Sequence, residues 1–253
     1  MLRLFSYILL FCLSNPALAS DIPDFSANYL VRLNGIQAGE LKRTLTTQEN
    51  GLRKFSSVSQ AKGVFSFFKP DVIEETSVWK LVDDRVTPQR YRYQRTGGKK
   101  DKFLQMQFNW RQKQVSIDDR EHPWELDIKT GVLDKLVYQI SLMRDLNKGI
   151  KQVDYLIADG GHLKTYEIKV LARETITTPM GQIETIKLTR HREKPNDRET
   201  TLWCAPALGY LPVKLEHVED EAVFTAVLRR LQGIDTEQAF TSLQPAKQLS
   251  NHE

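Results

Sequence analysis

The chain has 253 residues, of which 40% are hydrophobic and 27% are charged, with 36 Lys and Arg against 32 Asp and Glu. This is a globular composition, and it excludes a disordered or membrane-embedded chain. Two Cys exclude a disulfide-stapled scaffold and a multi-cysteine zinc or iron–sulfur site. A formal charge of +4 is too small to identify a nucleic-acid binder.

The first nineteen residues have the layout of a secretory signal peptide. Arg3 gives a positive start, residues 4–13 are uncharged and mostly apolar, and Ala17 and Ala19 are small residues two apart. Ten helical residues rise about 15 Å, half of a ~30 Å bilayer core, so a spanning anchor is not expected. We predict cleavage after Ala19, export to the periplasm, and no transmembrane anchor in the mature chain.

Alternation of apolar and polar residues with a period of two dominates from Phe25 to Leu231. In residues 103–110, Leu104, Met106 and Phe108 share one face and Gln105 and Gln107 share the other, as in a half-buried antiparallel strand. The predicted strands are 25–33, 37–47, 52–61, 72–82, 88–95, 102–110, 113–118, 152–158, 163–171, 174–178, 183–190, 199–204, 211–218 and 222–231.

One segment has helical periodicity instead. Apolar residues recur at three- and four-residue spacing from Leu133 to Leu146, and Gly149 supplies a stop, which predicts an amphipathic α-helix at about 132–148. The predicted fold is mainly β: a strongly curved antiparallel sheet or incomplete β-barrel with this one central helix. We expect a single domain over 20–234, with two sub-sheets flanking the helix as the alternative. Residues 235–253 are polar and aperiodic, which predicts a disordered tail.

Several short segments, spread over nearly all of the mature chain, carry a family resemblance. In chain order they are Asn34-Gly35-Ile36, Ala38-Gly39-Glu40, Phe67-Phe68-Lys69-Pro70, Gly97-Gly98-Lys99-Lys100, Phe108-Asn109-Trp110, Leu133 to Gln139, Ala158-Asp159-Gly160-Gly161, Leu202 to Pro206 and Tyr210-Leu211-Pro212-Val213. In content and order they resemble the bacterial domain-of-unknown-function family 3108, a set of exported, mostly β proteins. The resemblance implies a periplasmic β-rich domain, and it implies no reaction and no catalytic residues.

The segment from Arg85 to Lys113 has the most uneven charge in the chain. Alternation places Arg90 and Arg92 on one strand face and Tyr91 and Tyr93 on the other. A basic hairpin of this kind could bind phosphates of an envelope polyanion or dock an envelope protein, and the alternative is a solvated face balanced by acidic neighbours. Export argues against a nucleic-acid partner. The candidate residues are Arg90, Arg92, Arg95, Lys99, Lys100 and Lys102.

Two apolar groups are candidates for binding a lipid or another amphiphile. Phe65, Phe67 and Phe68 lie between a Gly and a Pro, and they could form a lip over an apolar cavity or mark a bend in the core. On the predicted helix, Leu133, Val137 and Ile140 belong to an apolar stripe, which forms core more often than a ligand wall.

Sequence signatures of known enzyme classes are missing. The chain has no Gly-x-Ser-x-Gly elbow, His-Glu-x-x-His helix, phosphate-binding loop or dinucleotide fingerprint, and no residue spacing predicts a metal or cofactor site. The leading hypothesis is a non-enzymatic protein that binds an apolar or amphiphilic envelope molecule in a cavity between sheet and helix. The alternatives are an envelope protein-interaction module that docks through a strand edge or the basic hairpin, and a hydrolase with an unrecognised site.

Overall fold

The computed structural model describes residues 22–68, 70–98, 100–190, 199–219 and 221–242. The predicted signal peptide and Lys99 lie outside these residues. The strands in chain order are β1 (Phe25–Leu33), β2 (Ile36–Thr47), β3 (Arg53–Ala61), β4 (Val72–Val82), β5 (Arg85–Thr96), β6 (Lys102–Asn109), β7 (Gln114–Asp118), β8 (Trp124–Asp127), β9 (Leu133–Asp134), β10 (Gln152–Asp159), β11 (His162–Thr178), β12 (Gly181–Arg190), β13 (Glu199–Ala205), β14 (Leu211–Glu219) and β15 (Ala222–Gln232). The helices are α1 (Phe65–Phe68), α2 (Tyr138–Asn147) and the 3-10 helix η1 (Pro206–Leu208).

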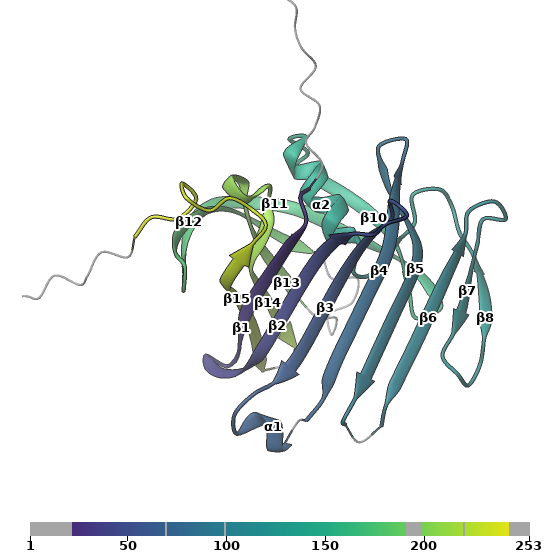
Figure 1. The fold of residues 1–253 in the computed structure, drawn as a ribbon, viewed down its shortest axis with the longest axis horizontal. Coiled ribbons are helices and arrows are strands. Elements are labelled where there is room, and N and C mark those ends of the chain that lie inside the picture. The colour runs from purple at the N-terminus through teal and green to yellow at the C-terminus, as the bar shows by residue number, and fades with distance from the viewer. Residues whose placement is uncertain (1–21, 69, 99, 191–198, 220, 243–253) are drawn as a thin grey trace, which may run out of the picture.

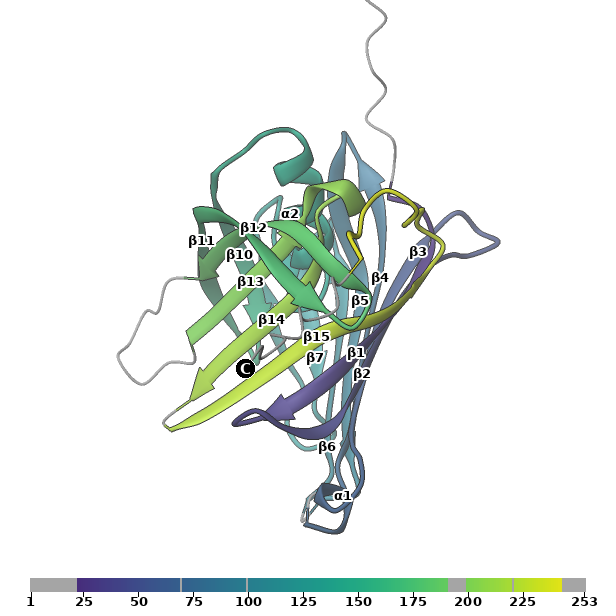
Figure 2. The same cartoon turned by 90° about the vertical axis from the view of Figure 1, so that its left-hand side faces the viewer.

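All fifteen strands form one sheet in the order β8-β7-β6-β5-β4-β3-β2-β1-β15-β14-β13-β12-β11-β10-β9. Neighbours are antiparallel except β9 and β10, and β1 pairs with β15 in the middle of the sheet. The two edge strands, β8 and β9, are consecutive in the chain, and only residues 128–132 join them. Five residues reach less than about 20 Å, so the sheet must curl until its edges approach each other. Figures 1 and 2 show the resulting open barrel.

The predicted fold class, a strongly curved antiparallel sheet or incomplete barrel with a central helix, is confirmed. The Asn34-Gly35 hairpin turn is also confirmed, because both residues have the positive φ of a type I′ turn, +47° and +82°. The strand prediction missed β8, whose four residues are too few for a clear alternation. It also divided β11 into two strands, whereas the structure has one strand of 17 residues with a bulge between Val170 and Ala172.

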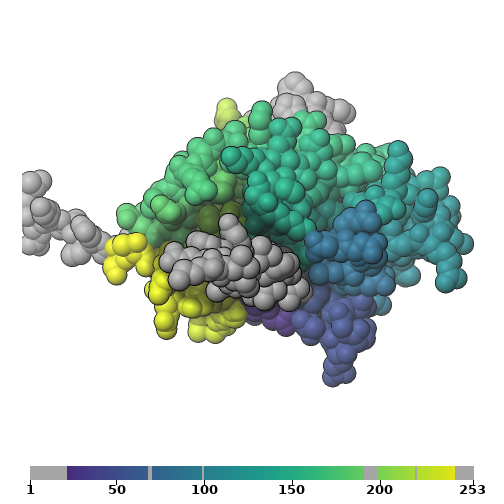
Figure 3. Space-filling view, turned by 90° about the horizontal axis from the view of Figure 1, so that it is seen from above, coloured from purple at the N-terminus to yellow at the C-terminus, as the bar shows by residue number. Residues whose placement is uncertain are grey.

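Helix α2 covers the upper end of the open barrel (Figure 1), and in the space-filling view from above the teal and green segments around it cover much of that end (Figure 3). Asp84, in the β4–β5 turn, forms ion pairs with Arg144 and with Lys148, the latter at 2.6 Å. On the other side of the helix, the Tyr155 hydroxyl donates to Asp145 at 2.7 Å. The helix is therefore tied to both walls of the curled sheet.

The helix is shorter than the predicted 132–148. Leu133 lies in β9 and not in the helix, and the helix begins after Val137. The Asp134 carboxylate accepts hydrogen bonds from the backbone N–H groups of Leu136 and Val137, at 2.9 and 2.8 Å. These bonds hold residues 134–137 in a turn, although the apolar spacing alone predicts a helix there.

The chain also stays ordered beyond the predicted domain boundary at residue 234. Thr241 forms an isolated β-bridge with Gln182, and Phe240 packs against the core. The prediction of a disordered tail is therefore wrong for 235–242, and residues 243–253 lie outside the described residues. Within the described part of the chain, no helix has the length and apolar character needed to cross a bilayer.

Candidate functional site

The interior of the curled sheet is filled at the α2 end and open at the opposite end. On four strands of one wall, a fully buried inward residue is followed, farther from α2, by a half-buried one. These pairs are Tyr29 and Val31 in β1, Ser77 and Glu75 in β4, Tyr91 and Tyr93 in β5, and Met106 and Leu104 in β6. The facing wall changes in the same way, from Leu188 to Arg190, Leu215 to His217, and Ala226 to Phe224. Side chains on both walls therefore face a solvent-accessible interior at this end.

A row of polar side chains marks the boundary between the filled and open ends. Strand register places Arg43, Ser57, Glu75 and Tyr93 side by side on the inner face of β2–β5. The buried Tyr91 hydroxyl donates to Glu75 at 2.6 Å. Burial, reinforced by the Glu75 charge, raises the pKa of Tyr91 well above its ordinary value. Tyr91 therefore stays a protonated donor that holds Glu75 in place.

Arg43 is the most unusual member of this row, because its charge is buried without a carboxylate. Its side chain is 8% exposed, and Nη1 donates to the Gln139 Oε1 atom of α2 at 2.6 Å. The guanidinium lies over the Tyr29 ring, 5.8 Å from its centroid, and Nε has no hydrogen-bond partner. Among the described residues no carboxylate forms an ion pair with Arg43. Glu75 lies two strands away in the row, about 10 Å at the ~4.8 Å strand spacing.

Aromatic rings and two further cations surround the same region. Tyr138, at the start of α2, meets Tyr166 of β11 edge to face at 5.3 Å, and Arg190 lies 4.3 Å from the Tyr166 ring centroid. On the other wall, Lys135 Nζ lies 4.4 Å from the centroid of Tyr93. Burial raises the pKa of Tyr138, and the charges of Arg190 and Arg43 oppose this rise. Tyr138 thus lies within electrostatic reach of both arginines, which come from opposite walls.

Asp134 links the edge strand β9 to β4. It is fully buried, and the Ser77 hydroxyl of β4 donates to it at 2.5 Å. Burial raises the pKa of Asp134 to about 6, although its three hydrogen bonds oppose the rise.

Comparison with known proteins gives a family and a fold. A family model described as "Protein of unknown function (DUF3108)" matches residues 28–228. The chain belongs to the DUF3108 family. No curated protein matches the chain. Among solved structures, it is similar to a beta-barrel-like protein of the domain of unknown function DUF1849 from Brucella abortus, at 10% identity and a TM-score of 0.54. The match covers 85% of this chain and 99% of that one, and at this identity it shows the fold alone.

The six residues predicted to line a ligand cavity do not lie together in this DUF3108 chain. Leu133, Val137 and Ile140 are buried in the main core cluster, so the space between α2 and the sheet is filled where they lie. Phe65, Phe67 and Phe68 form α1 at the lower tip of the β3–β4 connection (Figure 1), and the Phe67 side chain is 86% exposed. This segment is therefore not a bend through the core, and it lies at the end of the molecule opposite α2 (Figure 1).

The predicted basic hairpin is present on β5 and β6, but its cations differ in environment. Arg90 and Arg92 are exposed on the outer face, and Tyr91 and Tyr93 face inward, as predicted. Arg95 forms a two-point ion pair with Asp71, at 3.0 and 2.9 Å. Lys100 and Lys102 are exposed at the β5–β6 turn, and Lys99 lies outside the described residues.

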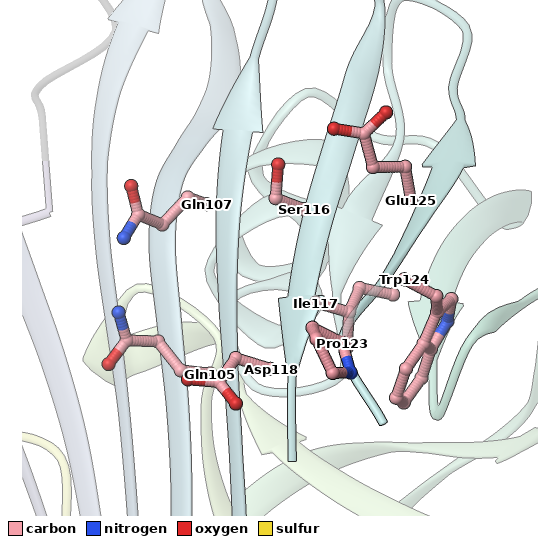
Figure 4. A pocket seen from close by; sticks show the side chains of 8 residues that line it. All are labelled: Gln105, Gln107, Ser116, Ile117, Asp118, Pro123, Trp124 and Glu125. Atoms are coloured by element: carbon pink, nitrogen blue, oxygen red, sulfur yellow. The ribbon is translucent and has the colours of Figure 1, made fainter. Parts of the chain in front are cut away.

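A shallow recess of about 360 Å³ lies on the outer face of β6–β8, beside Arg90 and Arg92 in the strand register. Figure 4 shows Gln105 and Gln107 on one side of it and Pro123 and Trp124 on the other. The remaining lining residues are Ser116, Ile117, Asp118 and Glu125. Four of these eight side chains are amides or carboxylates, so the lining combines polar and apolar groups.

The described residues contain no group of three or more His, Cys, Asp or Glu side chains that could hold a metal ion. Cys204 is fully buried in β13, and burial raises the pKa of its thiol. A thiol with these properties is a poor nucleophile.

Sequence reasoning missed Arg43, Glu75 and Lys135. One signal was available for Arg43, since it occupies an inward position of the alternation Leu41, Arg43, Leu45. Its neighbours Gln139 and Tyr138 are almost a hundred residues away, and only the topology brings them together.

Proposed function

We propose that this DUF3108 protein is an exported, non-enzymatic binding protein for an amphiphilic envelope molecule. The apolar part of the ligand occupies the open half of the sheet interior, which is the half away from α2 where the inward side chains are half-buried. An acidic head group of the ligand reaches Arg43. The observation that carries the proposal is the inner face itself, whose side chains change from buried to half-buried along the strands of both walls.

The open half offers an apolar wall with few polar groups. Val31 of β1 and Leu104 of β6 are half-buried inward residues, and Phe224 of β15 faces inward from the other wall. Tyr93 adds an aromatic ring between them. A concave, mostly apolar surface with a few convergent polar groups is the usual form of a small-molecule site in proteins.

The inner end of this space carries positive charge. A buried, unpaired guanidinium is costly, because it has left water without gaining a counter-charge. A carboxylate or phosphate placed against Arg43 would supply that charge and would accept from the free Nε. Lys135 and Arg190 lie on either side of the same region and add to the attraction.

Export follows from the N-terminal segment, whose charged start, short apolar stretch and Ala17-Leu18-Ala19 ending fit a cleaved signal peptide. An exported binding protein for amphiphiles would act in the periplasm, between the membranes that hold its ligands.

The test is native mass spectrometry of residues 20–253 purified from the periplasm, followed by titration of the stripped protein with hexadecanoate and with hexadecanol. We expect a stoichiometric adduct, and binding of the acid at least tenfold tighter than binding of the alcohol. Ser59→Trp should block binding because Ser59 faces the open half from β3, whereas Ser56→Trp, on the outer face of the same strand, should not. A bare mass with no uptake of either probe would overturn the proposal.

A further inference from the structure

The lower tip of the molecule exposes apolar side chains at a position fixed by local hydrogen bonds. Val64 is 68% exposed and Phe67 is 86% exposed, the two highest values among the large hydrophobic residues of the described chain. The Ser66 hydroxyl and backbone N–H both donate to the carbonyl oxygen of Gly63, at 2.7 and 3.1 Å. The short helix α1 therefore presents Phe67 to solvent in an ordered turn.

The β5–β6 turn packs directly against this tip. A Cβ atom built on Gly97 would lie 2.7 Å from the carbonyl oxygen of Pro70, so the two backbones are in close contact. The ion pair between Arg95 and Asp71 fastens the two segments to each other. The Phe segment and the basic hairpin, which the sequence suggests as separate candidates, thus form one surface. We name this surface the lower tip: residues 62–68, 70, 71, 95–98 and 100–102.

The lower tip is basic as well as apolar. It carries four cations, Lys62, Arg95, Lys100 and Lys102, against the two carboxylates of Asp71 and Asp101, a net charge of +2. Lys100 and Lys102 are exposed, and Asp71 is already paired with Arg95. Exposed aromatic and aliphatic side chains next to lysines are typical of surfaces that insert into the interface of an anionic bilayer.

The lower tip lies at the open end of the sheet interior. Tyr93 and Arg95 are successive inward positions of β5, so the strand passes from the open half directly into the tip. Figures 1 and 2 both show α1 at the end of the molecule opposite α2. Contact of the tip with a membrane would therefore bring the opening of the interior close to the bilayer.

We propose that the lower tip docks this protein on an anionic lipid bilayer, with Val64 and Phe67 entering the interface and Lys100 and Lys102 contacting lipid phosphates. This inference does not depend on the proposed ligand, because Val64, Phe67, Lys100 and Lys102 are separate from Arg43 and from the inner wall. The charge of the tip favours a membrane over an apolar protein partner.

The experiment is co-sedimentation of residues 20–253 with sucrose-loaded vesicles of phosphatidylglycerol and phosphatidylethanolamine, and with vesicles of phosphatidylcholine alone. We expect binding to the anionic vesicles that weakens in 0.5 M salt, and at least tenfold weaker binding to phosphatidylcholine. The double variant Val64→Ser/Phe67→Ser should lose at least tenfold in affinity. Lys100→Glu/Lys102→Glu should abolish the preference for anionic lipid.

The matched control is Leu171→Ser, which removes a 55% exposed apolar side chain from β11, away from the tip. Its vesicle binding should equal that of the wild type. Equal binding of the wild type and the Val64/Phe67 double variant would overturn the inference. Absence of wild-type binding to anionic vesicles at low salt would overturn it too, including the case in which the tip captures an envelope protein instead. Uptake of hexadecanoate by the double variant at the wild-type level would show that the ligand site is intact. A result of the vesicle experiment would then concern the lower tip alone and not the proposed function.

Discussion

The Ser77 hydroxyl donates a 2.5 Å hydrogen bond to the buried carboxylate of Asp134, and this bond joins strands from distant parts of the sheet. Ser77 lies in β4 and Asp134 in β9, and nine strands separate β4 from β9 in the sheet order. The contact is possible only because the sheet curls through almost a full turn. A side-chain bond, rather than a strand ladder, thus links β9 to the wall that it approaches.

The position of Asp134 predicts a pH-dependent stability. Its folded-state pKa of about 6 lies above the ordinary 3.8, so the folded protein holds this proton more tightly than the unfolded chain. The resulting stability is fully present below pH 4 and is lost as the pH rises through 6. Two pKa units correspond to roughly 3 kcal/mol in the free energy of unfolding. Urea unfolding of the wild type and Asp134→Asn at pH 4, 5, 6 and 7 measures this term, because the variant cannot ionise.

We expect the stability difference between wild type and Asp134→Asn to move in favour of the variant as the pH rises from 4 to 7. Parallel pH profiles for the two proteins would show that Asp134 does not titrate in this range.

A second prediction concerns the β10–β11 turn, where Gly161 lies against the edge strand β8. Gly161 has φ of +86°, and a Cβ atom there would lie 2.5 Å from Nε1 of Trp124. Gly160, in the same turn, has φ of +59° and open space around its Cβ position. Gly160→Ala therefore carries only the backbone cost of about 1–2 kcal/mol. Gly161→Ala should lose about 1–3 kcal/mol more, because it displaces the indole.

Urea unfolding of both variants gives this difference, and a Trp124→Ala background identifies its cause. The additional loss at Gly161 should disappear in that background, since the clashing ring is absent. If the additional loss persists without the ring, β8 is not held against this turn by Trp124.

The sheet was predictable because its signal is local and repeated. Alternation such as that of Leu104, Met106 and Phe108 recurs in strand after strand, and Asn34-Gly35 sets a turn by its own conformational preference. The start of α2 was not predictable, because Leu133, Leu136 and Val137 keep a helical spacing. The hydrogen bonds of Asp134 and the pairing of β9 with β10 override that spacing.

The candidate site was largely hidden from the sequence, because its residues meet only after the sheet has curled. Arg43 and Gln139 are 96 positions apart, and Arg190 approaches the same region from a third part of the chain. Apolar runs were visible in the sequence but ambiguous: Ile140 belongs to the core and Phe67 to an exposed tip, although both were candidates for binding a ligand.

This difference gives a third prediction. Ile140 is fully buried in α2, so Ile140→Ala should reduce the free energy of unfolding by about 2–5 kcal/mol. Phe67→Ala removes a larger side chain from an exposed position and should change stability by less than about 0.5 kcal/mol. Thermal and urea unfolding of the two variants check both values. A stability loss at Phe67 comparable with that at Ile140 would show that the tip is packed in solution.

The last prediction separates stability from binding at Arg43. Burying a charge without a counter-charge costs free energy, and an apolar side chain of similar length does not carry that cost. Arg43→Met should therefore leave the ligand-free protein within about 1 kcal/mol of the wild type, or more stable. The same change removes the cation at the inner end of the open half, so the affinity for hexadecanoate should fall at least tenfold while that for hexadecanol stays unchanged.

Lys42→Met is the matched control, because Lys42 precedes Arg43 in β2 and is exposed on the outer face. It removes the same charge without touching the interior, and it should alter neither stability nor the preference for the acid. Isothermal titration of the stripped proteins gives the affinity of each protein for hexadecanoate and for hexadecanol. Urea unfolding gives the free energy of unfolding of each protein. A strong destabilisation by Arg43→Met, with the preference for the acid intact, would instead mean that Arg43 serves the fold through Gln139 and Tyr29 and does not receive the head group.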